Sequence, residues 1–258
     1  MKMVEKKSII QEIIEALGEK SKNKKVEDLR IGLCYTAVLL NDGHLGLAYT
    51  FHSHNVPPCI TSLEAGTING KNAIDVIPYA LSDNLLESSV GIATTNAIVN
   101  QQIDNAIEGD ILDVICLKNS DTVGMVGFFG PLIDPLKKLV KKLYIFEERH
   151  TTNLPDVYPS EKTPEILPAC DIIIISATTL INKTIEPLLY LSKDARETII
   201  LGATTPFFPH IFTTRGVTML SGIRVLDEKR VLQIVSEGGG MRDFKNTIKK
   251  VSILLKKN

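Results

Sequence analysis

The segment from Ile172 to Ile175 consists of four consecutive isoleucines, and it constrains the fold more than any other part of the sequence. A strand with one face in water alternates apolar and polar residues, whereas a strand that is apolar throughout is buried on both faces. Such strands occur in parallel sheets that carry helices on both sides. The sequence therefore predicts a buried parallel strand inside an α/β domain.

Strand-like and helix-like patterns alternate around this segment from Asp121 onward. We expect strands over Thr122 to Phe128, Leu143 to Glu147, Asp171 to Ser176, Thr198 to Gly202 and Val217 to Val225. We expect helices over Pro131 to Lys142, Leu180 to Leu191, Pro206 to Thr213 and Glu228 to Glu237. Alternation of this kind is typical of right-handed crossovers in a Rossmann-like, doubly wound parallel sheet.

The first part of the chain has a different order of elements. We expect a helix over Ser8 to Lys20, strands over Val26 to Leu40 and Leu45 to Phe51, and helices over Asn72 to Ala80 and Asn84 to about Ile103. The turn signal Asn41-Asp42-Gly43 between the two strand runs indicates a hairpin. The sequence thus predicts an α+β domain over residues 1–105, followed by the α/β domain over residues 106–258.

The balance of charge bears on which partners are expected. The chain has 29 basic and 30 acidic residues, a formal net charge of -1, so we expect neither nucleic acid nor a membrane surface as a partner. No apolar run approaches the length of a membrane span, and the first residues do not resemble a signal peptide. A cytoplasmic protein with reduced cysteines is expected.

Glycines and small hydroxyl residues follow several of the predicted strands. In an open parallel sheet, ligands bind beyond the carboxyl ends of the strands, where the strand order reverses. The expected lining of such a crevice is Gly127, Phe128, Gly130, Thr178, Thr179, Thr204, Thr205 and Ser221. Each hydroxyl also fits a simpler role as a helix cap, and it is the convergence of several loops that favours a small-molecule site.

Two glycine-rich segments point toward anionic groups. Gly124, Gly127 and Gly130 have the spacing G-x-x-G-x-x-G, and Glu147 ends the next predicted strand. The dinucleotide fingerprint requires G-x-G-x-x-G, so bound NAD or FAD is not expected, although Glu147 fits the acidic position of that fingerprint. Gly238, Gly239 and Gly240, with Arg242 just after them, fit either a loop that closes on an anion or a plain turn.

A candidate metal site lies after the second predicted strand of the first domain. His52 and His54 are two residues apart, so in an extended segment both imidazoles point to the same side. Cys59 and Glu64 follow, and a transition or heavy metal accepts such ligands. The spacing matches no zinc signature, so these side chains also fit ordinary surface positions.

Several segments resemble one known family, described as putative heavy-metal chelation. They are Thr122 to Pro131, DIIIISATTLIN from Asp171 to Asn182, LGATTP from Leu201 to Pro206, Gly216 to Asp227 and Glu237 to Gly240, with Gly46 to Thr50, Leu81 to Asp83 and Asn96-Ala97 in the first domain. The resemblance implies an N-terminal domain like the small domain of enolase, a Rossmann-like second domain and a site where they meet. It carries over onto Gly127, Thr178, Thr179, Asn182, Thr204, Thr205, Ser221 and Gly238 to Gly240, but it does not support the His52 and His54 pair.

Three functions follow from these observations. The first is a protein that binds a heavy metal or a metal chelate in an interdomain cleft. The second is an enzyme that acts on a nucleotide or another phosphorylated or carboxylated small molecule. The third is a non-catalytic interaction protein, and the sequence leaves open both catalysis and formation of a homodimer.

Overall fold

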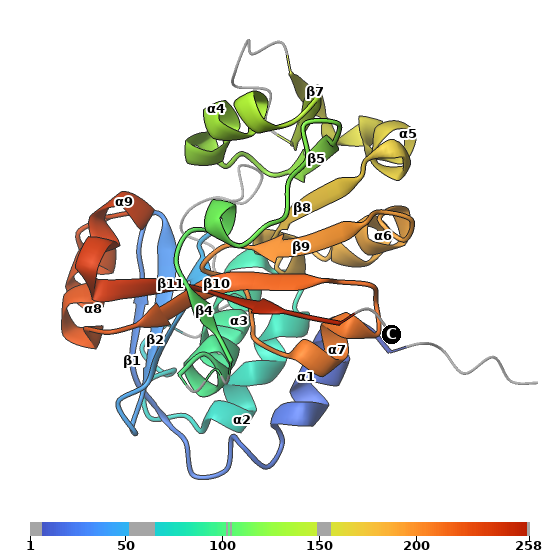
Figure 1. Cartoon of the computed structure of the whole chain (residues 1–258). Helices are drawn as coiled ribbons and strands as arrows, with labels where there is room; N and C mark the ends of the chain where they lie inside the picture. The colour runs from blue at the N-terminus through green and yellow to red at the C-terminus, as the bar shows by residue number, and fades with distance from the viewer. Residues whose placement is uncertain (1–6, 52–64, 102, 104, 149–155, 257–258) are drawn as a thin grey trace, which may run out of the picture.

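The computed structural model describes residues 7–51, 65–101, 103, 105–148 and 156–256, and their backbone forms two β-sheets with helices around them (Figure 1). The smaller sheet is antiparallel and has the order β1 (Val26–Ile31), β2 (Tyr35–Leu40) and β3 (Leu45–Tyr49). The larger sheet has eight strands in the order β4-β11-β10-β9-β8-β5-β6-β7. The chain thus has the mixed α/β architecture that the sequence predicts.

The larger sheet is mostly parallel. Its strands are β4 (Ile107–Glu108), β5 (Thr122–Val126), β6 (Lys142–Glu147), β7 (Val157–Pro159), β8 (Ile172–Ser176), β9 (Glu197–Leu201), β10 (Met219–Val225) and β11 (Ile248–Leu254). The chain moves outward from β5 to β6 and β7, then returns to the other side of β5 to form β8, β9 and β10. This order is doubly wound, as predicted, and its switch point lies between β5 and β8.

The four isoleucines of β8 divide between the two faces of this sheet. Ile172 and Ile174 pack in an apolar cluster with residues of α4 (Gly130–Leu139), whereas Ile173 and Ile175 pack in a second cluster on the opposite face. All four are at most 1% exposed. The prediction of a strand buried on both sides is confirmed.

Helices cover both faces of the large sheet, and one long helix lies between the two sheets. The helices are α1 (Ile9–Leu17), α2 (Ala73–Val76), α3 (Leu85–Val99), α4, α5 (Thr163–Ile166), α6 (Ile185–Leu191), α7 (Pro209–Thr213), α8 (Glu228–Ser236) and α9 (Met241–Phe244). Single 3-10 turns add η1 (Ile77–Leu81), η2 (Ile111–Asp113), η3 (Ser160–Lys162), η4 (Leu167–Ala169), η5 (Ala177–Leu180) and η6 (Lys245–Thr247). Within the described residues, no helix has both the length and the apolar composition for a membrane span.

The core is continuous between the two parts of the chain. One apolar cluster contains Ile13 of α1, Val38 of β2 and Ile92 of α3 together with Ile175 of β8 and Leu188 of α6. Polar contacts add to it, because Arg215, two residues after α7, donates two hydrogen bonds, of 2.7 and 3.0 Å, to the carboxylate of Glu12 in α1. The two-domain division near residue 105 stays a prediction, since one apolar cluster contains residues of both parts.

Some local predictions were wrong. The run from Val26 to Leu40 was expected as one strand, but the chain reverses at Gly32 to Cys34 and forms β1 and β2. No strand was expected after α9, yet Ile248–Leu254 forms β11, antiparallel to β10. The sequence of this strand does not show the alternation of a half-buried strand, because Lys249 and Lys250 are exposed one after the other and Val251 and Ser252 are both buried.

Candidate functional site

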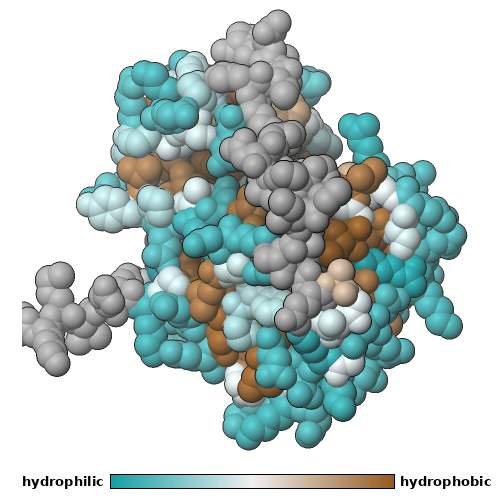
Figure 2. All heavy atoms as spheres, turned by 180° about the vertical axis from the view of Figure 1, so that it is seen from behind, coloured by the Kyte–Doolittle hydropathy of each residue, from teal (hydrophilic) through white to brown (hydrophobic). Residues whose placement is uncertain are grey.

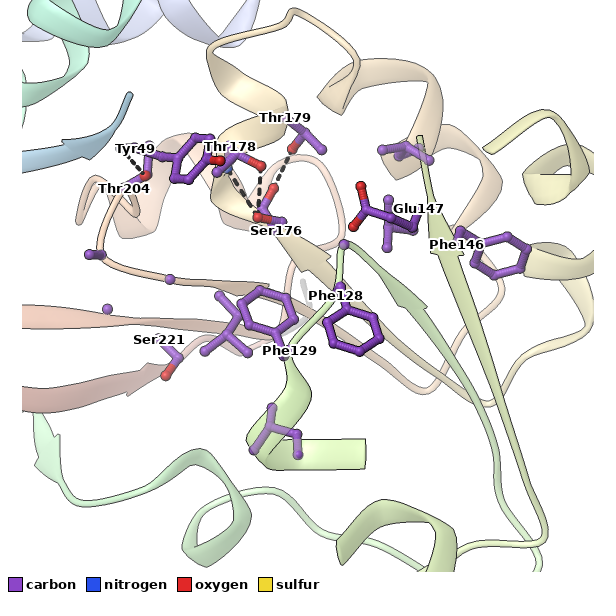
Figure 3. Close-up of a pocket in the computed structure, with 18 of the residues that line it drawn as sticks. Tyr49, Phe128, Phe129, Phe146, Glu147, Ser176, Thr178, Thr179, Thr204 and Ser221 are labelled. Atoms are coloured by element: carbon purple, nitrogen blue, oxygen red, sulfur yellow. Dashed lines mark hydrogen bonds between the residues drawn. The ribbon is translucent and has the colours of Figure 1, made fainter. Parts of the chain in front are cut away.

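A cleft of about 830 Å³ lies between the two parts of the chain, and Figure 3 shows its lining. Its floor is formed by the residues that end or follow β5, β6, β8 and β9, together with the middle of β10. Its opposite wall carries Tyr35, Tyr49 and Phe51 from the small sheet. Clefts of roughly 300–1,000 Å³ are typical small-molecule sites, and the switch point of a doubly wound sheet is where they occur.

Gly127 makes the turn between β5 and α4 at the switch point. Its φ is +97°, a conformation that favours glycine, and a Cβ added there would lie 2.8 Å from the Cβ of Ser176. The Gly127 amide donates to the carbonyl of Phe146, 2.8 Å away, which fixes this turn against β6. The turn presents Phe128, which is 42% exposed, and leads into α4, whose first turn has no side-chain cap.

The loop after β8 contributes a cluster of three hydroxyl groups. The hydroxyls of Ser176 and Thr178 are 2.8 Å apart, and the amide of Thr178 donates to the Ser176 hydroxyl. Thr179 donates its hydroxyl proton to the carbonyl of Ser176, over 2.6 Å, so it stabilises the loop (Figure 3). Ser176 and Thr178 are therefore the groups of this loop with remaining capacity to contact a ligand.

The loop after β9 is held against the small sheet. The amide of Tyr49 donates to the hydroxyl of Thr204, 3.0 Å away, so a residue of β3 and a cleft residue are directly joined. Asn96 of α3 donates from its side-chain amide to the carbonyls of Leu47, at 2.8 Å, and Thr204, at 3.1 Å. These bonds set the position of the cleft wall relative to its floor.

Two adjacent carboxylates form the acidic end of the cleft. Glu147 ends β6, and Figure 3 shows its carboxylate pointing toward the loop that carries Ser176. Glu148 follows and accepts a hydrogen bond of 3.2 Å from the side-chain amide of Asn182. Carboxylates in this arrangement attract a cation or hydrogen-bond a donor group of a ligand.

The wall from the small sheet is aromatic. The rings of Tyr35 and Tyr49 have centroids 6.3 Å apart, and those of Tyr49 and Phe51 are 5.2 Å apart, both pairs edge to face. Burial, together with the nearby Cys34 and Tyr49, raises the pKa of Tyr35 to about 12. Tyr35 therefore keeps its proton at neutral pH and remains a neutral wall residue.

Lys183 holds the β8 loop against the first part of the chain. Its ammonium group donates to the hydroxyl of Ser88 in α3, at 2.6 Å, and to the carbonyl of Ala80 in η1, which precedes α3. The backbone at Lys183 has a φ of +64°, so the turn is fixed in an uncommon conformation. Burial lowers the pKa of Lys183 to about 8, and nearby Asp83 acts weakly in the opposite direction.

A pH-dependent stability follows from this lowered pKa. Between pH 8 and the ordinary value of 10.5, the folded amine has lost its proton while the unfolded amine keeps it. The unfolded state then binds more protons, so the contribution of Lys183 to stability rises with pH across this window and is flat below it. We expect the melting temperature of the wild type minus that of Lys183→Met to increase from pH 8 to 10, while the exposed control Lys193→Met shows a constant difference. A constant difference for both variants would contradict this assignment.

The structure brings most of the predicted ligand residues into one cleft. Gly127, Phe128, Gly130, Glu147, Thr178, Thr179, Asn182, Thr204 and Ser221 all belong to its lining. Thr205 does not: it is fully buried, and its hydroxyl donates to the carbonyl of Ser221, 2.9 Å away. Gly238, Gly239 and Gly240 also lie outside the lining, where Gly238 and Gly240 face the turn at Leu33 and Cys34.

The predicted metal ligands His52, His54, Cys59 and Glu64 lie outside the described residues. Among the residues that the structure does describe, no three His, Cys, Asp or Glu side chains converge in a way that could hold a metal ion. The metal assignment to this segment therefore stays a prediction.

Sequence reasoning expected a cleft between the two domains but named no residue of the small sheet in its lining. Tyr35, Tyr49 and Phe51 lie at the end of the small sheet nearest the cleft, and Tyr35 and Tyr49 are paired across β2 and β3. Alternate aromatic residues at one end of a predicted hairpin were the available signal. Nothing in the sequence shows which loop these rings face, so their place in the cleft could not be inferred from it.

Two family profiles and one relative together match most of the chain. The sequence matches the profile of the DUF364 family over residues 110–254 and that of the DUF4213 family over residues 14–99, both with the description "Putative heavy-metal chelation". An uncharacterized protein of Methanocaldococcus jannaschii is 28% identical over 260 residues, which span 95% of this chain and 97% of that protein.

Two solved structures have the same fold. A DUF364 protein of unknown function from Pyrococcus horikoshii is 26% identical with a TM-score of 0.85, over 96% of this chain and 100% of that one. A DUF364 protein of unknown function from Desulfitobacterium hafniense DCB-2 is 26% identical with a TM-score of 0.80, over 95% of this chain and 96% of that one. Both sheets are therefore part of the shared fold.

Proposed function

The chain belongs to the DUF364 family, whose description is putative heavy-metal chelation, and from this premise we propose that the cleft binds a metal ion as an organic chelate. The observation that carries the proposal is the composition of the cleft: two adjacent carboxylates lie at one end of a space of about 830 Å³, and most of the remaining lining consists of hydroxyl-bearing, glycine, aromatic and aliphatic residues. A bare ion needs far less room than this, whereas an organic ligand fills it.

The two carboxylates supply only part of a coordination shell. Metal ions in proteins take four or more donor atoms, and Glu147 and Glu148 are the acidic side chains at this end of the cleft. In the proposed complex, the chelating molecule supplies the remaining donors. Its own polar groups contact the hydroxyls of Ser176 and Thr178, and its apolar parts contact Phe128 and Tyr49.

The proposal is tested with Ni²⁺ and its citrate complex as probes, by native mass spectrometry and titration calorimetry. We expect the wild type to bind the complex more tightly than Ni²⁺ alone, and Glu147→Gln to weaken binding of the complex about tenfold or more, because a charged ligand group is lost. The exposed Glu161→Gln serves as a control of equal charge change. Unchanged affinity in both Glu147→Gln and the double variant Thr178→Ala with Thr204→Ala would contradict the assignment of the cleft.

A nucleotide or other phosphorylated molecule is the second candidate ligand. Gly127 turns the chain into the uncapped start of α4, and Glu147 ends the adjacent strand β6, as in dinucleotide-binding domains. The spacing of the glycines differs from that fingerprint. A nucleotide that raises the melting temperature would favour this alternative. A ligand at a concentration of 100 times its dissociation constant stabilises the folded state by about 2.7 kcal/mol.

A further inference from the structure

Arg242 is an unusual arginine in this protein. Of the six arginines in the part of the chain that the structure describes, the other five each have a hydrogen bond or ion pair through the side chain, whereas none is found for Arg242. Arg242 is exposed, and it belongs to the lining of the cleft. A guanidinium that faces a ligand cleft without a protein partner is available to an oxyanion of the ligand.

The fold places Arg242 and the carboxylates on different elements of the cleft. Glu147 ends β6, whereas Arg242 lies in α9, whose Phe244 packs against the ring of Tyr35 with centroids 5.4 Å apart. Lys250 of β11, paired with Asp110 at 2.6 Å, also belongs to the lining. Five strand spacings separate β6 from β11 in the sheet, which at about 4.8 Å each amounts to about 24 Å.

The cleft is thus charged with opposite signs at its two ends. The carboxylates of Glu147 and Glu148 lie at the β6 end, whereas the β11 side carries Arg242 and the Lys250–Asp110 ion pair. The two charges of that pair offset each other, so Arg242 supplies the net positive charge on this side. Helix α9, which carries Arg242, lies beside the small sheet (Figure 1). The middle of the lining, from Ser176 to Ser221, is neutral. An elongated ligand with unlike ends would therefore be held in one orientation by these charges.

We propose that Arg242 forms an anion-binding end of the cleft, which recognises a carboxylate or phosphate group carried by an elongated ligand. This deepens the proposed function, because the chelated metal lies at the carboxylate end and the free oxyanion of the same ligand lies at Arg242. Guanidinium binds either oxyanion through two parallel hydrogen bonds. The triple glycine before Arg242 packs against Leu33 and Cys34, so it anchors α9 at this end of the cleft.

The test uses the full chain and two metal-free probes, citrate and pyrophosphate, each titrated by calorimetry at low and at high salt. The variants are Arg242→Gln and, as the matched control, Arg230→Gln, since Arg230 is outside the lining and its guanidinium donates to the side chain of Gln233 in α8. We expect at least one anion to bind the wild type and the control, with an affinity that falls as salt rises. Arg242→Gln should weaken that binding about tenfold or more.

The two probes identify which oxyanion is recognised, and the result is independent of metal. Equal anion affinity in the wild type and Arg242→Gln would overturn the inference, as would the lack of binding of either anion at millimolar concentration. The Ni²⁺ titrations with Glu147→Gln test the proposed function separately. Anion binding that depends on Arg242 without any metal effect would therefore support this inference and contradict only the metal chelate.

Discussion

Replacing Gly46 by alanine is expected to destabilise the protein by about 3 kcal/mol or more, which is among the largest effects of a single methyl group. A Cβ at Gly46 in β3 would lie 2.1 Å from both the carbonyl oxygen of Ala93 and the amide nitrogen of Ala97. Both contacts are with the backbone of α3, so no side chain can rotate to make room. The strand and the helix would have to separate, and apolar packing between the two sheets would be lost with them.

Chemical denaturation of Gly46→Ala measures this effect, and Gly18→Ala provides the control. Gly18 has a φ of -41°, and a Cβ there would meet only the carbonyl of Glu15, at 3.5 Å, which is an ordinary contact. The control should therefore keep the wild-type stability within about 0.5 kcal/mol. A loss below about 1 kcal/mol for Gly46→Ala would mean that β3 and α3 can move apart freely, contrary to the close packing described above.

The Rossmann-like sheet could be predicted because its signals are local. The isoleucines of β8 show burial on both faces within five residues, and the order of strands and helices restricts the topology to a few forms. The hydroxyl-rich residues after β8 and β9 could be located for the same reason, since each directly follows its strand. Gly127, Thr178 and Thr204 were thus placed in one crevice before any contact between them was visible.

Contacts between distant parts of the chain could not be predicted in this way. Gly46 looks like an ordinary strand residue, and only its distance to α3 explains why glycine is required there. Gly238 to Gly240 illustrate the opposite case, because a triple glycine resembles a ligand loop although it packs against the turn of the small sheet. In both cases the deciding partner is about 50 or more than 200 residues away, and no local pattern encodes it.

Asn96 gives the second large expected effect, because it joins the small sheet to the cleft from inside the protein. It is fully buried, and its side-chain amide donates to the carbonyls of Leu47 and Thr204. Asn96→Leu keeps a similar volume but leaves both carbonyls without this donor. A buried carbonyl without a partner costs about 1–3 kcal/mol, so we expect a loss of about 2–4 kcal/mol in unfolding free energy.

Gln101→Leu is the matched control for this variant. Gln101 also donates a side-chain amide proton to a carbonyl of β3, that of Leu45 at 2.9 Å, but it is only partly buried. Water can replace the lost donor there, so a cost of about 1 kcal/mol or less is expected from urea denaturation. Equal losses for the two variants would mean that water also reaches the carbonyls at Asn96.

The effect of Asn96→Leu on the cleft is separable from its effect on stability. Thr204 would keep the hydrogen bond from the Tyr49 amide to its hydroxyl but lose the one to its carbonyl, so the β9 loop gains freedom relative to the aromatic wall. Affinity for the nickel citrate complex, measured well below the melting temperature, should then fall in Asn96→Leu and stay unchanged in Gln101→Leu. A stable Asn96→Leu protein with wild-type affinity would show that the wall and the floor of the cleft are positioned by the shared apolar core alone, because packing among residues such as Ile92 and Ile175 would then suffice.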